Sequence, residues 1–173
     1  MCRLIQVLTE RVEVFNHPVN HIAISIPDLQ AAEEWYMRVL GFSRLRPSKT
    51  LDRATEPHAA IFKIYPTSLQ RVQVAYLSSG NGVGVELFEF QEPRIRQGSE
   101  SNFERDISRG GLFHMAITTP DVVAMCDHVV TSGGKMIGQA VTVFGQDAVY
   151  AQDPWGNVVE LLSCSFDQLM SNR

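Results

Sequence analysis

Cysteine is scarce in this sequence, and the three cysteines form no recognisable pair or cluster. Cys2, Cys126 and Cys164 lie far apart along 173 residues, without the spacing of a CxxC motif or of a zinc site. A sparse, odd number of cysteines favours reduced thiols in an intracellular protein over a disulfide framework. No motif around them supports a catalytic thiol, so small buried hydrophobic residues are the simpler interpretation.

Long runs of basic or apolar residues are also missing. Lysine and arginine number 15 against 19 acidic residues, the net charge is −4, and no basic run could follow a phosphate backbone. The apolar stretches are far shorter than the roughly 20 residues of a membrane helix, and the N-terminal one is too short for a signal peptide. We therefore expect a cytoplasmic protein with no nucleic-acid or membrane partner.

The sequence does contain an internal repeat. HIAISIPDL at 21–29 matches HMAITTPDV at 114–122 at five of nine positions, with an offset of 93. GNGVGVELFEF at 80–90 resembles DPWGNVVELLSC at 153–164, because each places a glycine-containing turn before an apolar strand with one carboxylate. The offset is 74 there, so the first copy has about 19 more internal residues. This extra length falls within 43–70, where three prolines predict a loop.

Each copy is predicted to contain one strand, one helix and three further strands, which indicates an α+β fold. Alternating apolar residues predict the strands, and apolar residues at helical spacing follow a potential N-cap, Asp28 or Asp121. The predicted elements are 21–26, 29–40, 42–47, 72–79 and 84–90, then 114–119, 122–132, 135–141, 148–153 and 157–164. The predicted organisation is an extension at 1–19, a βαβββ module at 20–92, a connector at 93–111, a second βαβββ module at 112–166 and a tail at 167–173.

Two histidines and two glutamates occupy equivalent positions in the two copies. His21 and His114 start the first strand of each copy, on the face opposite the residues that would pack against the helix. Glu86 and Glu160 stand alone in apolar strands, where a carboxylate is costly unless it is paired or bound to a cation. A single histidine or glutamate of this kind is usually an ordinary polar residue, but the recurrence of all four predicts a metal site.

These motifs resemble the vicinal oxygen chelate superfamily, which includes glyoxalase I, methylmalonyl-CoA epimerase, fosfomycin resistance enzymes, extradiol dioxygenases and bleomycin-binding proteins. The resemblance rests on HIAISIPDLQAAEEWYMRVLGF, VGVELFEF, FHMAITTPD and DPWGNVVELL. It implies two βαβββ modules in a half-open barrel around one metal, with ligands from the first and last strand of each module. Those ligands would be His21, Glu86, His114 and Glu160. The resemblance also implies a homodimer, whose modules pair within or between chains.

Two imidazoles and two carboxylates suit Zn, Ni, Co, Fe(II) or Mn. Such an ion acts as a Lewis acid that polarises a carbonyl and stabilises an enediolate. A ligand carboxylate that swings off the metal can serve as the base, and Glu160 is the first candidate for this catalytic role, followed by Glu86. The resulting hypothesis is a glyoxalase-type lyase or isomerase with a small carbonyl substrate. Residues 43–70 and 91–111 are predicted to shape the pocket.

Two alternatives remain open from the sequence. An Fe(II)-dependent extradiol-type dioxygenase would need two histidines and one carboxylate, and Glu86 as a fourth ligand argues against it. A small-molecule-binding or resistance protein would use the same cleft, with Phe88, Tyr150 and Trp155 as its walls, although bleomycin-binding relatives typically lack the metal ligands. No glutathione-binding signature is evident, and no carboxylate precedes the third strand as it does in the epimerases of the family.

Overall fold

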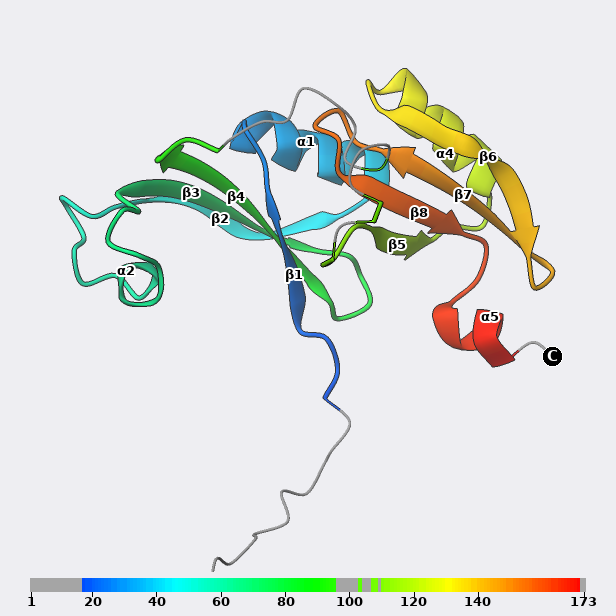
Figure 1. Ribbon diagram of the computed structural model, residues 1–173, viewed down its shortest axis with the longest axis horizontal. Coiled ribbons are helices and arrows are strands. Elements are labelled where there is room, and N and C mark those ends of the chain that lie inside the picture. Colours follow the sequence, from blue (N-terminus) through cyan, green and yellow to red (C-terminus); the bar gives the residue numbers. More distant parts are fainter. Residues whose placement is uncertain (1–16, 96–102, 104–106, 109, 172–173) are drawn as a thin grey trace, which may run out of the picture.

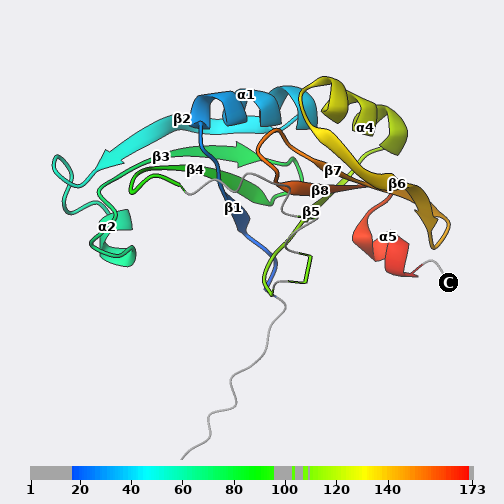
Figure 2. The same ribbon diagram turned by 45° about the horizontal axis from the view of Figure 1, so that its top comes forward.

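The computed structural model describes residues 17–95, 103, 107–108 and 110–171. They form two four-stranded mixed sheets that lie side by side (Figure 1). Helix α1 (Leu29–Leu40) covers one sheet and α4 (Val122–Thr131) covers the other, on the same side of the molecule (Figure 2). The two sheets do not close into a barrel. The α+β class with two βαβββ modules is therefore confirmed, while the N-terminal extension up to residue 16 and most of the connector lie outside the described residues.

The first module has its first and last strands side by side. Its strands are β1 (His21–Ser25), β2 (Ser43–Asp52), β3 (Arg71–Ser78) and β4 (Gly84–Glu92), in the order β1-β4-β3-β2. Strand β1 is parallel to β4, and the other pairs are antiparallel. Helix α1 starts where Asp28 accepts a hydrogen bond of 3.0 Å from the Ala31 amide. It ends at Gly41, whose φ of 71° is the left-handed conformation that glycine tolerates best.

The second module repeats this topology. Its strands are β5 (Met115–Thr118), β6 (Lys135–Val143), β7 (Gln146–Gln152) and β8 (Val158–Leu162), in the order β5-β8-β7-β6. Asp121 caps α4 by accepting a hydrogen bond of 2.9 Å from the Ala124 amide, as Asp28 caps α1. The internal repeat of the sequence is thus a repeat of structure.

Two segments contain more regular structure than the sequence indicates. Strand β2 runs through Pro47, and α2 (Ile61–Ile64) follows, where a loop is predicted. An edge strand tolerates proline because one side of its backbone has no ladder partner, and the β2–β3 register shifts between Arg46 and Lys49. Helix α5 (Phe166–Ser171) occupies most of the segment predicted to be a tail. Among the described residues no helix is long and apolar enough to span a membrane.

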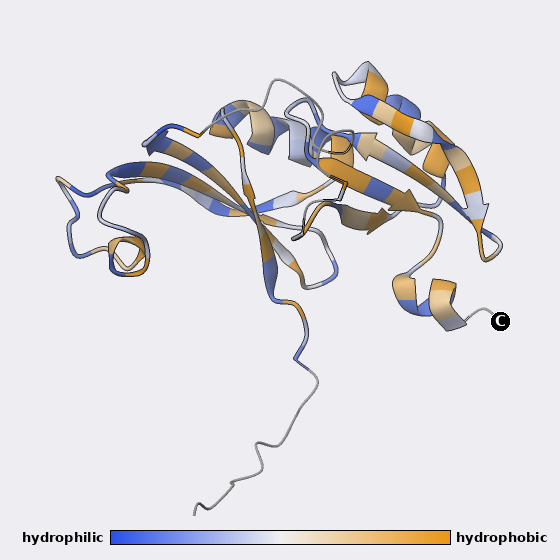
Figure 3. Cartoon of the chain, viewed as in Figure 1, coloured by the Kyte–Doolittle hydropathy of each residue, from blue (hydrophilic) through white to orange (hydrophobic). Residues whose placement is uncertain are grey.

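The main hydrophobic core lies between the helices and the sheets and joins the two modules. Trp35 of α1 donates a hydrogen bond of 2.9 Å to the Ser132 carbonyl at the end of α4. Strand β8 is hydrophobic apart from one hydrophilic band, as its sequence VVELL requires (Figure 3). Residues of both modules share the core, among them Leu29, Tyr36, Val39, Val85, Leu87, Val129, Val149 and Leu161. The helices therefore cover the core side of both sheets, and the opposite faces carry the candidate site.

Candidate metal centre and substrate pocket

The two glutamates lie on the sheet faces that the helices leave uncovered. Along a strand, side chains alternate between faces, so the orientation of Glu86 and Glu160 follows from that of their neighbours. Those neighbours are buried beneath the helices: Val85, Leu87, Val159 and Leu161. Both glutamates therefore point away from the core, as the sequence predicts.

Each histidine lies beside the glutamate of its own module. Nε2 of His21 is 3.5 Å from Oε2 of Glu86, and Nε2 of His114 is 3.3 Å from Oε2 of Glu160. The contact arises because the first strand of each module pairs in parallel with the last one, which brings the two ends of the module together. We call each His–Glu pair a half-site.

The donor atoms of each half-site fit a divalent ion. Two ligands that each lie about 2.0–2.2 Å from one ion are separated by about 3–3.5 Å, which is close to the separation in both pairs. Nδ1 of His21 lies 2.8 Å from Oδ1 of Asn20. A contact of this kind at the second ring nitrogen orients a metal-ligating histidine. The chemistry and spacing of each pair are thus compatible with metal binding, and equally with a simple ion pair.

The two half-sites differ in burial and in their remaining polar contacts. The side chains of His114 and Glu160 are 26% and 18% exposed, against 48% and 27% for His21 and Glu86. Nδ1 of His114 is buried and has no hydrogen-bond partner among the described residues. A buried polar atom left unpaired costs about 1–3 kcal/mol. The second half-site is therefore the drier of the two, and Nδ1 of its histidine lacks a hydrogen-bond partner among the described residues.

The structure brings the four predicted ligands together as two pairs. Within the described ranges, no three or more His, Cys, Asp or Glu side chains are grouped so that they could hold one ion. One copy of the chain thus presents two half-sites, each on the uncovered face of its own sheet.

A tyrosine stands beside the glutamate of each half-site. Tyr76 is the cross-strand partner of Glu86, and Tyr150 is the partner of Glu160. Tyr150 hydrogen-bonds to Glu160, and its ring centroid is 5.3 Å from that of His114. Burial, and then the Glu160 carboxylate, raise the pKa of Tyr150, so its hydroxyl keeps its proton and is the donor. The sequence prediction included Tyr150 but missed Tyr76, although both tyrosines precede their glutamates by the same number of residues.

Family comparison bears directly on this arrangement. Residues 19–161 match the model of the Glyoxalase/Bleomycin resistance protein/Dioxygenase superfamily. The chain belongs to this superfamily. The match spans both half-sites and most of both modules.

Named relatives of this glyoxalase-superfamily chain include two enzymes. It is 29% identical over 151 residues to a 2-epi-5-epi-valiolone epimerase from an Actinomyces species, over 84% of this chain and 78% of that protein. It is 24% identical over 152 residues to a probable lactoylglutathione lyase from Vibrio cholerae, over 85% and 91% of the two chains. A glyoxalase family protein of known structure from Bacillus cereus superposes with a TM-score of 0.68 at 14% identity, over 87% and 96% of the chains. Identity that low supports the fold alone.

Each half-site of this superfamily member adjoins a cavity. One cavity of about 580 Å³ is lined by Glu86, Tyr76 and Phe88 of the first sheet and by residues around α2. Another, of about 410 Å³, adjoins His114 between β1 and β5. Both volumes fall in the usual range for small-molecule sites, about 300–1,000 Å³.

The three predicted pocket residues lie in three different places. Phe88 lines the cavity beside Glu86, and Tyr150 contacts His114. Trp155 instead packs against the main core, with its ring centroid 6.3 Å from that of Trp35. The structure therefore places Trp155 with the helices and not with the half-sites.

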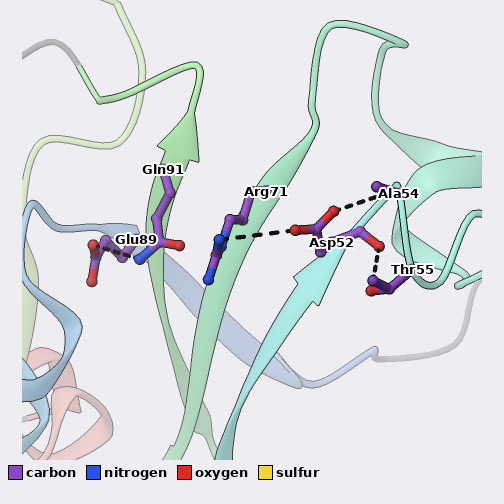
Figure 4. A network of polar contacts seen from close by, with 6 residues as sticks. All are labelled: Asp52, Ala54, Thr55, Arg71, Glu89 and Gln91. Atoms are coloured by element: carbon purple, nitrogen blue, oxygen red, sulfur yellow. Dashed lines mark hydrogen bonds and ion pairs between the residues drawn. The ribbon is translucent and has the colours of Figure 1, made fainter.

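Glu89, the other glutamate in the middle of β4, has a structural role. Its side chain accepts hydrogen bonds from the Leu29 amide at 2.9 Å and from the Gln91 side chain at 3.0 Å. Figure 4 shows the Gln91 contact beside the ion pair of Arg71 with Asp52, whose atoms are 3.9 Å apart. Glu89 thus lies on the helix side of the sheet, as expected from the opposite orientation of Glu86.

Proposed function

We propose that this chain is a metal-dependent isomerase or lyase that moves a proton next to the carbonyl group of a small substrate. The observation that carries the proposal is the recurrence of a His–Glu pair on the uncovered face of each sheet, at 3.5 and 3.3 Å. The epimerase and lyase names of the two relatives agree with a reaction of this class.

The proposed ligands are His21, Glu86, His114 and Glu160. Two imidazole nitrogens and two carboxylates suit Zn, Ni, Co, Fe(II) or Mn. When bound, such an ion supplies Lewis-acid polarisation of the substrate carbonyl and so makes the adjacent C–H bond more acidic.

The carboxylates of the chain carry the proton. Glu160 is the proposed base, and Tyr150 holds it in place by donating a hydrogen bond to it. A proton returned to the same carbon from the opposite face gives epimerisation, and one returned to the neighbouring carbon gives isomerisation. Glu86, from the other half-site, is the proposed second acid or base.

We propose further that the complete centre forms between two copies of the chain. Val19 and Leu112 each precede a half-site histidine by two residues, occupy equivalent positions in the repeat and are 63% and 76% exposed. Exposed apolar side chains at equivalent places beside both half-sites suit a two-fold symmetric interface. Such a dimer would join the first half-site of one copy to the second half-site of its partner, twice.

Hydrogen exchange at the substrate tests the proposed function directly. The metal-free protein is loaded in turn with each of the five metals, and hemithioacetals and α-hydroxyketones are incubated with it in heavy water. We expect about one ion per chain and metal-dependent incorporation of deuterium next to the carbonyl, both measured alongside Glu160→Gln. That variant should bind metal more weakly and lose the exchange.

Two results would contradict the proposal. Failure of every metal to bind, with unchanged ligand binding by His21→Ala, would favour a binding protein. Oxygen uptake with a catechol by the Fe(II) form, without deuterium incorporation into any carbonyl substrate, would favour the extradiol-type dioxygenase.

A further inference from the structure

The cavity beside Glu86 has one wall that exists only in the first module. The wall comes from the segment that makes the first copy longer than the second, and it includes α2. Around α2 the lining residues are Ala59, Ala60, Ile61, Ile64 and Tyr65, and the part of the segment before them contributes Lys49, Leu51 and Glu56. The residues around α2 are apolar apart from the tyrosine hydroxyl, so α2 presents a hydrophobic surface toward a proposed metal ligand, and the two charged lining residues of the segment pair with each other.

This wall is held firmly against the sheet. Arg53 donates hydrogen bonds of 2.8, 3.4 and 3.2 Å to the carbonyls of Leu69, Phe62 and Pro66, and its guanidinium lies 4.5 Å from the centre of the Phe62 ring. A second buried cluster, separate from the main core, fills the space beneath: Leu51, Phe62, Leu69, Val72, Val74 and Phe88. A wall fixed at several points can shape a pocket before a ligand arrives.

The sheet side of the cavity carries aromatic surface that continues into the α2 wall through Tyr65. The ring of Tyr65 stacks with that of Phe88 at a centroid distance of 6.4 Å, and Phe88 stacks with Phe90 at 5.7 Å. Tyr76 lies next to Glu86 at the metal-ligand end. A flat or apolar group that entered the cavity would therefore contact both aromatic rings and aliphatic side chains.

The charged residues that line the cavity are either paired or acidic. Lys49 is the only basic residue among the described lining residues, and its Nζ lies 2.8 Å from Oε2 of Glu56. Glu86 is itself acidic. A substrate carboxylate placed here would lose its hydration without meeting an unpaired basic residue of the lining, which is unfavourable. Arg46 lies outside the lining, with its guanidinium 5.7 Å from the centre of the Tyr76 ring.

We propose that this cavity selects substrates whose reacting carbonyl carries an uncharged, apolar group the size of a ring, and that the α2 segment determines this specificity. The inference rests on the proposed function, because Glu86 must help to hold the ion that fixes the carbonyl at the end of the cavity. It goes further by naming the substrate class, and it disfavours compounds with an anionic tail at this position.

Matched hydroxamates test the specificity separately from the metal. Acetohydroxamic acid and benzohydroxamic acid chelate a metal through the same two oxygens and differ by the ring, and 4-carboxybenzohydroxamic acid adds a negative charge. Their dissociation constants are measured by calorimetry on the metal-loaded protein. We expect benzohydroxamic acid to bind at least about tenfold more tightly than acetohydroxamic acid, and the carboxylated compound to lose most of that gain.

Two surface variants test whether the α2 segment causes the preference for the ring-bearing hydroxamate. Ile64 is 77% exposed, so Ile64→Glu should fold, and it places a charge on the cavity wall. Val123 on α4, 57% exposed and absent from the lining residues, provides the control Val123→Glu. Ile64→Glu should reduce the preference for the ring by about threefold or more, whereas Val123→Glu should preserve it. Acetohydroxamic acid should bind all three proteins equally.

The outcomes separate the two proposals. If acetohydroxamic acid binds but the ring adds no affinity, or if Ile64→Glu keeps the full preference, the specificity inference is wrong and the metal site stands. If the protein takes up no metal and binds neither hydroxamate, the proposed function fails, and the inference that rests on it fails as well.

Discussion

Tyr36 of the first module donates a hydrogen bond of 2.9 Å to the carboxylate of Asp153 in the second module. Asp153 is only 3% exposed and also accepts hydrogen bonds from Asn157 and from the Trp155 amide. Burial raises the pKa of Asp153, and these hydrogen bonds oppose that rise. Burial and the nearby carboxylate raise the pKa of Tyr36 well above its usual value, so the phenol remains a donor. The two residues form a buried polar connection between the modules.

The free energy of unfolding should depend on pH through Asp153. Because its pKa is raised in the folded state, the folded protein binds this proton more tightly than the unfolded chain does. The stabilising contribution is therefore complete below the ordinary pKa of aspartate and is lost as the pH rises through the folded value. We expect Asp153→Asn to lack this decline in thermal midpoint, measured across the acid range beside the unchanged protein. Parallel pH profiles of the two proteins would refute the assignment.

Removal of the Tyr36 hydroxyl should destabilise the joined modules. Tyr36→Phe leaves the buried carboxylate of Asp153 with one donor fewer, and a hydrogen bond to a charged group contributes about 1.5–3 kcal/mol. We expect a loss of that size in the free energy of unfolding, measured in urea. Tyr65→Phe is the control, since the Tyr65 hydroxyl has no hydrogen bond within the described part of the chain, and it should change the free energy by less than about 0.5 kcal/mol. Equal losses in the free energy of unfolding for Tyr36→Phe and Tyr65→Phe would contradict a stabilising contact between Tyr36 and Asp153.

Complementation between defective chains should reveal a metal centre shared by two copies. His21→Ala disables the first half-site, and Glu160→Gln disables the second. If each centre joins half-sites from different chains, a mixed dimer contains one intact centre and one centre with both defects. Co-refolding of the two inactive variants should then restore about a quarter of the normal metal content and activity. Centres formed within one chain would give no recovery.

Tyr150 should act as a positioning residue for Glu160. Its hydroxyl donates a hydrogen bond to the proposed base, so Tyr150→Phe should lower kcat about tenfold with little change in KM. Metal content should be unchanged, because the variant keeps all four ligands. Tyr76→Phe removes the corresponding hydroxyl beside Glu86 and should have a smaller effect. A loss that appears only in KM, or equally in both variants, would contradict this role.

Much of each module was predictable because its signals are local. The alternation of apolar residues in β4 and β8 directs Glu86 and Glu160 away from the helices, and Asp28 and Asp121 start the helices as predicted N-caps. By contrast, the continuation of β2 through Pro47 depends on its position at the edge of a sheet. No neighbouring residue specifies that position.

The sequence by itself determined the duplicated βαβββ order and the four candidate ligands, since both follow from a repeat and from the two-residue period of a strand. Tertiary structure alone decided how those ligands are grouped, how α2 forms a pocket wall beside Glu86, and which buried pair joins the modules. These features depend on contacts between segments far apart in the chain. Such contacts are set by how the two modules pack, and no local pattern records that packing.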